Sequence, residues 1–279
     1  MRLAAVGDVL LARGVERQIA KHGRGYPFKK IKSTISRADL AFFNLECTLS
    51  TRGTPHRRRF LFRADPALAG TLHSSGFDVA SLANNHTTDF GRDAFTDTIA
   101  AVRRNEMIAV GAGKDRADAL RVRVVRKNGL RIGFVAYTDI PSGGVVRLGD
   151  RPTVAGANMD EVPGQIRAAK LRCDVLVVSF HWGIEYMTRP TERQRRLARL
   201  CIDNGADLIL GHHPHVLQTV EVYKSKPIVY SMGAFVWDPI LPRTDRSAIY
   251  LFDLSKSSAR LTRTIPVRIV RCQPELTAR

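Results

Sequence analysis

The segment D-L-I-L-G-H-H-P-H, residues 207–215, joins a short apolar strand to a group of histidines that follows it directly. An amphipathic helix is predicted over Pro190 to Asn204, and Gly205 ends it just before the strand begins. A helix that leads into a buried strand is typical of a layered α/β fold. Ligand sites in such folds gather at the carboxyl ends of strands, so the histidines mark a candidate site.

Four more apolar segments run into polar side chains in the same way. The predicted strands are Leu3 to Val6, Asp39 to Leu45, Phe77 to Leu82 and Asp174 to Phe180. The groups that follow them are Asp8, Glu46, Asn85 with His86, and His181. Because strands of an α/β sheet bring their carboxyl ends to one edge, we expect all five groups to converge there.

The rest of the sequence completes the α/β pattern. Further helices are predicted near Gly14 to Lys21, Arg92 to Arg104 and Glu161 to Leu171, and Asn128-Gly129 predicts a hairpin turn. Beyond the histidine segment, strands follow one another without helices, namely 216–223, 228–231, 248–254 and 261–270. We therefore expect a single α/β domain over residues 1–279, with a C-terminal third that is mostly β.

Composition excludes several classes of protein. Hydrophobic residues make up 44% and charged residues 25% of the chain, which excludes a disordered or collagen-like protein. No apolar run is long enough for a transmembrane span, and Asp8 interrupts the apolar start, so no signal peptide is predicted. We expect a cytoplasmic protein that reaches a membrane only through partners. The 4 cysteines form no C-x-x-C pair, which indicates reduced, buried thiols rather than a zinc ribbon or a disulfide framework.

The net charge of +18 favours anionic partners such as nucleic acid, acidic polymers or phosphorylated substrates. A genome that prefers Arg codons explains the same excess, because the basic residues are spread along the chain apart from Arg57 to Arg59 and Arg193 to Arg196. No helix-turn-helix, RNA-recognition or zinc-finger pattern accompanies the charge, so a nucleic-acid-binding protein is the disfavoured interpretation.

The groups at the strand ends form a metal-ligand set of oxygen and nitrogen atoms without thiolate. Two carboxylates, a carboxamide and several imidazoles suit Mn, Fe or Zn, and they suffice for two divalent ions. Glu46, which follows a middle strand, is the candidate carboxylate to bridge two cations. If the backbone is extended there, His213 and His215 share one face and can supply one ligand to each ion. His212 would then point away or contact another ligand.

Asn85 and His86 are neighbours with different expected roles. The Asn85 amide oxygen can bind a metal, while His86 is turned elsewhere and can act as a general acid. One histidine at a strand end is more often a hydrogen-bonded structural residue, but five ligand-type groups together favour metal binding. His22, His56 and His73 lack this placement and are expected at the surface. Glu185 and Tyr186 either line a pocket or cap their loop.

These residues resemble the CapA family, the capsule and poly-γ-glutamate biosynthesis branch of the calcineurin-like metallophosphatase superfamily. The resemblance covers Leu3 to about Asp238. It rests on Gly7-Asp8 with Arg13, Asn44-Leu45-Glu46, Ser81 to His86 with Asp89 and Gly91, Phe180 to Gly183 with Glu185-Tyr186, and Gly211 to Val216. It implies a four-layer α-β-β-α sandwich, made of two mixed β-sheets flanked by helices, with a dinuclear metal centre at one end.

By matching motif, the implied ligands are Asp8, Glu46, Asn85, His181, His213 and His215. The resemblance also places His86 near the leaving group and leaves Arg13 to steady an anionic substrate. It implies a hydrolase in which a metal-bridging hydroxide attacks a phosphate ester or a poly-γ-glutamate amide, and the sequence leaves both substrates open. The alternative is a non-catalytic, metal-containing protein that binds the polymer within a poly-γ-glutamate synthesis complex.

Two positions depart from the family pattern. The first motif of typical metallophosphatases is D-x-H, but Leu10 stands two residues after Asp8, so one metal site has one fewer histidine. Ala234 stands in Tyr230 to Phe235 where the family usually has Asn. Any polar contact made by that Asn is absent from this chain.

Overall fold

The side chains of the first strand, β1 (Arg2–Val9), alternate between two apolar clusters. Leu3 and Ala5 pack toward a second sheet, whereas Ala4 and Val6 pack under helices. The strand is therefore buried on both faces, which explains its nearly continuous apolar sequence.

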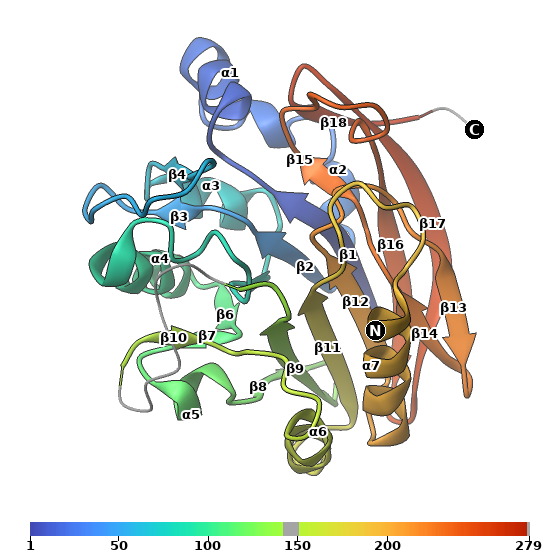
Figure 1. Ribbon diagram of the computed structural model, residues 1–279. Coiled ribbons are helices and arrows are strands. Elements are labelled where there is room, and N and C mark those ends of the chain that lie inside the picture. The colour runs from blue at the N-terminus through green and yellow to red at the C-terminus, as the bar shows by residue number, and fades with distance from the viewer. Residues whose placement is uncertain (142–150, 278–279) are drawn as a thin grey trace.

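This computed structural model describes residues 1–141 and 151–277 (Figure 1).

The first sheet has the strand order β18-β17-β16-β1-β2-β5-β6, and β15 pairs with β1 outside this path. β1, β2, β5 and β6 are parallel, whereas β16, β17 and β18 add an antiparallel half. The other strands of this sheet are β2 (Leu40–Leu45), β5 (Val79–Ser81), β6 (Ile108–Val110), β15 (Ala234–Val236), β16 (Arg246–Ser255), β17 (Ser258–Val270) and β18 (Gln273–Leu276).

The second sheet has the order β13-β14-β12-β11-β9-β8. Its inner strands are parallel, and β13 and β8 are antiparallel edges. Its strands are β8 (Arg123–Lys127), β9 (Leu130–Thr138), β11 (Val175–His181), β12 (Leu208–His212), β13 (Val220–Tyr223) and β14 (Lys226–Val229). Two small ladders pair β3 (Thr48–Leu49) with β4 (Arg63–Ala64) and β7 (Ala112–Gly113) with β10 (Thr153–Val154).

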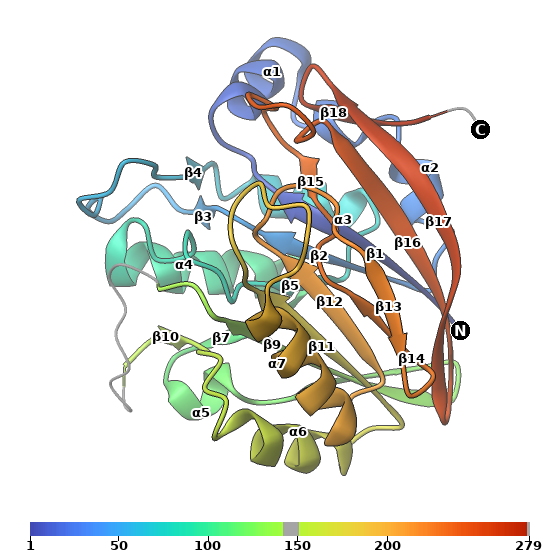
Figure 2. The ribbon, with the colours of Figure 1, turned by 45° about the vertical axis from the view of Figure 1, so that its right-hand side comes forward.

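The helices cover the outer face of each sheet, and the two sheets pack face to face (Figures 1 and 2). The first sheet is covered by α1 (Gly14–His22), η1 (Tyr26–Phe28), α2 (Lys32–Ile35), α3 (Leu68–Ser74) and α4 (Gly91–Arg104). The second is covered by α5 (Arg116–Ala119), α6 (Val162–Lys170) and α7 (Glu192–Asp203). The expected α-β-β-α sandwich with two mixed sheets is thus confirmed.

Local features follow from the sequence. Asn128 and Gly129 have φ values of 50° and 73°, the left-handed pair that a tight hairpin between β8 and β9 requires. Thr191 and Gln194 form a reciprocal capping box at the start of α7. Among the described residues, none of the helices combines the length and the apolar character needed to cross a lipid bilayer. All four cysteines are free and buried, as the sequence predicts.

Candidate metal centre

The five strand-end groups meet at one end of the paired sheets. His215 Nδ1 donates to Asp8 Oδ2 over 3.0 Å, and His181 Nε2 lies 2.8 Å from Asn85 Oδ1. Glu46 Oε1 lies between them, 3.8 Å from His181 Nε2 and 3.7 Å from His215 Nε2. The convergence expected from the sequence is therefore present in the structure.

Among the described residues, three groups of side chains place their ligand atoms within 4.8 Å of one another, close enough to hold a metal ion. Asp8, Glu46 and His215 form the first group, and Glu46, His181 and His213 form the second. Glu46 belongs to both, which is the arrangement a bridging carboxylate needs. The third group consists of Glu185, His213 and His215.

The two carboxylates differ in their electrostatic surroundings although both are completely buried. Burial by itself raises the pKa of Asp8, but the neighbouring His212 and His215 imidazoles outweigh it and hold that pKa well below its usual value. Burial also raises the pKa of Glu46, and repulsion from Asp8 and then Glu185 raises it further, well above the usual range. Glu46 Oε1 has no hydrogen-bond partner in the described structure. A cation beside Glu46 would relieve this unfavourable burial of charge.

The histidines are suited to offer lone pairs to a metal. Burial lowers the pKa of His181 well below its usual value and lowers that of His213 to about 3. Both imidazoles are consequently neutral at physiological pH, which is the form that binds metals. His213 Nδ1 is buried and unpaired within the described residues, as Glu46 Oε1 is. The donor set therefore fits divalent cations in chemistry as well as in proximity.

Asn44 holds three of these groups in place, a role that the sequence analysis did not assign. Its Nδ2 donates to Asp8 Oδ1 over 2.8 Å and lies 3.5 Å from Glu46 Oε2 and 3.3 Å from His181 Nδ1. Asn84 Nδ2 in turn donates to Asn44 Oδ1 over 3.1 Å. The signal was the two-residue spacing of Asn44 and Glu46, because alternate residues of a strand face the same side.

His86 lies beside the ligand groups and belongs to none of the three. Its Nδ1 lies 2.8 Å from Oδ2 of the buried Asp89, and its ring packs on Phe62 with centroids 4.1 Å apart. The carboxylate accepts a hydrogen bond from Nδ1–H and leaves Nε2 available for another partner. Asp89 was quoted in the sequence motif without a role, and its position three residues after His86 was the available signal.

Arg13 lies outside the ligand groups, against the same aromatic ring. Its guanidinium carbon is 5.7 Å from the centroid of Phe62, and Nη2 is 3.8 Å from Asp238 Oδ2. The side chain keeps 24% of its exposure. Arg13 therefore adds positive charge near His86 without contacting a predicted ligand.

The backbone of the histidine segment differs from the extended conformation considered in the sequence analysis. β12 ends at His212, and His213 and His215 have φ values of 95° and 57°. A turn brings the two rings to 5.8 Å between centroids, so the extended interpretation was wrong although both side chains belong to the ligand groups. His212 is completely buried, with Nδ1 3.3 Å from Asp8 Oδ1 but no hydrogen bond.

Residues 2–239 match a family described as "Bacterial capsule synthesis protein PGA_cap". The chain belongs to the PGA_cap family. Among PGA_cap-related proteins, "Capsule biosynthesis protein CapA" of Bacillus anthracis is 31% identical over 99% of this chain and 69% of its own length. "PGA biosynthesis protein CapA" of Bacillus subtilis (strain 168) is 32% identical over 96% of this chain and 72% of its own length.

A solved structure supports the fold seen in this PGA_cap member. The crystal structure of a hypothetical protein from Thermus thermophilus superposes with a TM-score of 0.59 at 17% identity. The match covers 95% of this chain and 98% of the other. At this identity the likeness concerns the fold alone.

The two departures noted in the sequence, Leu10 and Ala234, have clear positions. Leu10 is completely buried in the apolar cluster under the helices, so it supplies no ligand. Ala234 pairs with Asp8 in the ladder between β15 and β1, and its N–H donates to His215 O over 3.2 Å. The backbone at position 234 therefore supports two candidate ligands without a polar side chain.

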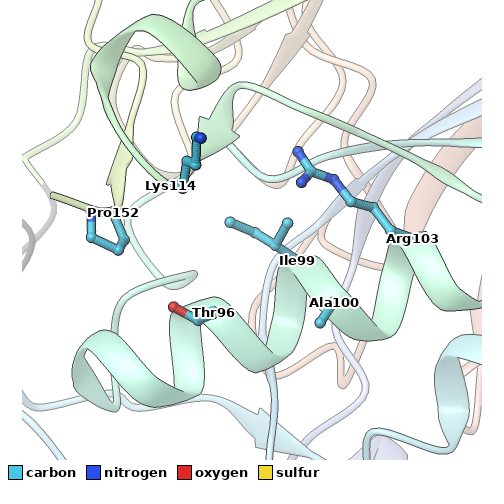
Figure 3. Close-up of a pocket in the computed structure, with 6 residues that line it drawn as sticks. All are labelled: Thr96, Ile99, Ala100, Arg103, Lys114 and Pro152. Carbon is cyan, nitrogen blue, oxygen red and sulfur yellow. The ribbon is translucent and has the colours of Figure 1, made fainter. Parts of the chain in front are cut away.

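A separate cavity of about 250 Å³ lies between α4 and the β7–β10 ladder (Figure 3). Its walls are mainly apolar, with the cationic side chains of Arg103 and Lys114 beside Ile99 and Pro152. None of the predicted site residues lines it. This cavity is independent of the candidate metal centre.

Proposed function

We propose that this chain is a two-metal hydrolase that acts on an anionic substrate in capsule or poly-γ-glutamate metabolism. The observation that carries the proposal is the position of Glu46, which is completely buried and shared by two ligand groups, with no hydrogen-bond partner for Oε1 among the described residues. A buried carboxylate beside a second carboxylate is costly unless a cation compensates it. The family membership and the relatives named for capsule and PGA biosynthesis support the metabolic setting.

The proposed ligands divide into two sets that share Glu46. Asp8, Glu46 and His215 would hold one ion, and Glu46, Asn85, His181 and His213 would hold the other. Mn, Fe or Zn suits these oxygen and nitrogen donors. When bound, such a pair of cations lowers the pKa of water and stabilises negative charge on a reacting group.

His86 is the proposed proton donor for the leaving group. Asp89 orients the ring through Nδ1, which leaves Nε2 to face a bound substrate. The packing of His86 on Phe62 restricts the ring to this orientation. Arg13 is proposed to balance the charge of an anionic substrate at the same side of the site.

The proposed substrate is a phosphate ester or a γ-glutamyl amide of an acidic polymer. Both are anionic, and the net charge of +18 favours both. A Mycobacterium tuberculosis relative, 33% identical over 72% of this chain, is called "Probable polyglutamine synthesis accessory protein". We infer from this name that the chain works beside a polymer-synthesis complex.

A second candidate function is a non-catalytic protein that binds polymer for such a complex. It is favoured by Leu10, which leaves the group of Asp8, Glu46 and His215 with one ligand fewer than the D-x-H pattern provides. The variant His86→Ala separates the two functions. A hydrolase would lose turnover and keep its metal, whereas a binding protein would keep both its metal and its affinity for the polymer.

The first experiment is elemental analysis of protein purified without chelators, beside Glu46→Ala. The hydrolase proposal predicts about two equivalents of Mn, Fe or Zn in the natural chain and loss of metal in the variant. Hydrolysis of phosphodiesters and of γ-glutamyl polymers is then compared between the natural chain and His86→Ala. Absence of metal even after reconstitution would overturn the proposal.

A further inference from the structure

Glu185 is an exposed carboxylate next to two buried histidines of the candidate metal centre. We propose that Glu185 is an additional ligand of the metal centre, where it binds the ion that Asp8, Glu46 and His215 would hold, next to the ion that His213 would hold. This inference rests on the proposed metal binding and extends it to a residue on the loop between β11 and α7. Glu185 would supply the ligand that is missing because Leu10 stands where the D-x-H motif has a histidine.

The loop that carries Glu185 is fixed against the histidine turn at two points. Trp182 N–H donates to His212 O over 3.1 Å, and Tyr186 N–H donates to Pro214 O over 2.8 Å. Tyr186 has a φ of 66°, a conformation that non-glycine residues seldom adopt. Glu185 lies between these two anchors, so the fold determines its position beside His213 and His215.

The start of the same loop packs closely against the beginning of α7. Gly183 has a φ of 85°, and a Cβ atom there would lie 2.6 Å from Gln194 Oε1. Gln194 belongs to the capping box of α7 and also donates from Nε2 to Gln218 over 3.0 Å. The loop is therefore packed on a fixed helix start.

A second observation points to a cation beside this carboxylate. His213 is only 6% exposed, and its Nδ1 has no hydrogen-bond partner among the residues described. Its ring belongs to the group of ligand atoms that includes the Glu185 carboxylate. A buried nitrogen without a hydrogen-bond partner is costly, and a bound cation would satisfy it.

The charge of Glu185 leads to the same conclusion. An isolated carboxylate beside the site would repel the anionic substrate that the proposed function requires. It would also add to the repulsion that Asp8 exerts on Glu46. A cation held by Glu185 and His215 would convert both unfavourable interactions into favourable ones, which accounts for a glutamate at this position.

The test is Mn²⁺ titration of the full chain, followed by calorimetry and by the electron paramagnetic resonance spectrum of the bound ion. We expect Glu185→Gln and Glu185→Ala to weaken one of the two Mn²⁺ equivalents at least tenfold and to change the resonance spectrum. Glu192→Gln, an exposed carboxylate on α7 outside the three ligand groups, is the matched control and should bind Mn²⁺ like the natural chain.

The outcomes distinguish this inference from the proposed function. Two Mn²⁺ equivalents with unchanged affinities and spectra in both Glu185 variants would overturn the inference and leave the two-metal proposal intact. A natural chain that binds no Mn²⁺ would overturn both. Circular dichroism of the variants checks their fold, which an exposed loop residue should leave unchanged.

Discussion

Replacement of Glu46 by Gln should stabilise the metal-free protein and destabilise the metal-loaded one. Glu46 is completely buried, and its Oε1 has no hydrogen-bond partner in the part of the chain that the structure describes. Burial, followed by repulsion from Asp8, raises its pKa well above the ordinary 4.5. Gln has the same size but no charge. The substitution therefore removes an unfavourable burial from the metal-free state and a shared ligand from the loaded state.

The magnitude follows from the extra cost of burying a charged rather than a neutral polar group, taken as about 1–3 kcal/mol. At about 2 °C per kcal/mol for a chain of this size, metal-free Glu46→Gln should unfold about 2–6 °C above the natural chain. The pKa of Glu46 is higher in the folded protein than the ordinary 4.5 of the unfolded chain. The natural chain therefore keeps its full stability below pH 4.5 and loses the contribution of Glu46 as the pH rises through the folded-state pKa. The advantage of Gln should therefore grow as pH rises above 4.5.

With cations present, the natural chain should unfold at a higher temperature than Glu46→Gln. Each cation at a hundredfold excess over its Kd stabilises the natural chain by about 2.7 kcal/mol, and the variant should lose most of this gain. Differential scanning calorimetry with chelator and with Mn²⁺ measures both states, and Glu16→Gln on the exposed surface of α1 is the control. Metal-free Glu46→Gln that unfolds at or below the natural temperature would refute the reasoning.

Three further predictions follow from the same structure. Asp89→Asn should lower the rate of hydrolysis about 10²-fold at unchanged metal content, because His86 loses its orienting partner. An unchanged rate would show that Asp89 does not orient His86 for catalysis. Burial of the ring lowers the pKa of His213 from 6.5 to about 3. Between pH 3 and pH 6.5, His213 is therefore protonated in the unfolded chain and neutral in the folded one. Metal-free protein should lose about 1.4 kcal/mol of stability per pH unit from this residue as pH falls through that range, and His213→Gln should flatten the dependence in urea titrations. Gly211→Ala should destabilise the fold by about 1–3 kcal/mol, since its Cβ would lie 2.0 Å from Tyr230 O, whereas Gly156→Ala meets nothing within 4 Å and should melt normally.

The candidate ligands at the ends of strands could be predicted because each strand and the polar residue after it are visible in a short stretch of sequence. Apolar segments such as Asp174 to Phe180 identify buried strands, and the polar residue that follows each strand is visible in the sequence. The parallel α/β pattern then brings these residues to one edge. Packing of the two sheets against each other joins Asp8 of the first sheet to His215, which follows the second.

Features that depend on distant contacts could not be predicted in this way. β15 is three residues long, and it pairs in parallel with β1 from the opposite end of the chain. The turn at His213 and His215 is supported by the Tyr186 N–H bond to Pro214 O, a contact between separate loops. Local propensity contains no information about such partners, so the sequence suggested an extended segment where the structure has a turn.

The left-handed backbone of His213 and His215 has a consequence for laboratory evolution of this protein. Non-glycine residues in such conformations cost of order 1–3 kcal/mol each, and Gly or Asn accepts them more readily. A library selected only for heat resistance in the presence of a chelator should accumulate Gly or Asn at these two positions. The selected variants would be more heat-stable but would lack the two imidazoles that are proposed to bind metal. Selection on this scaffold must therefore include metal from the first round.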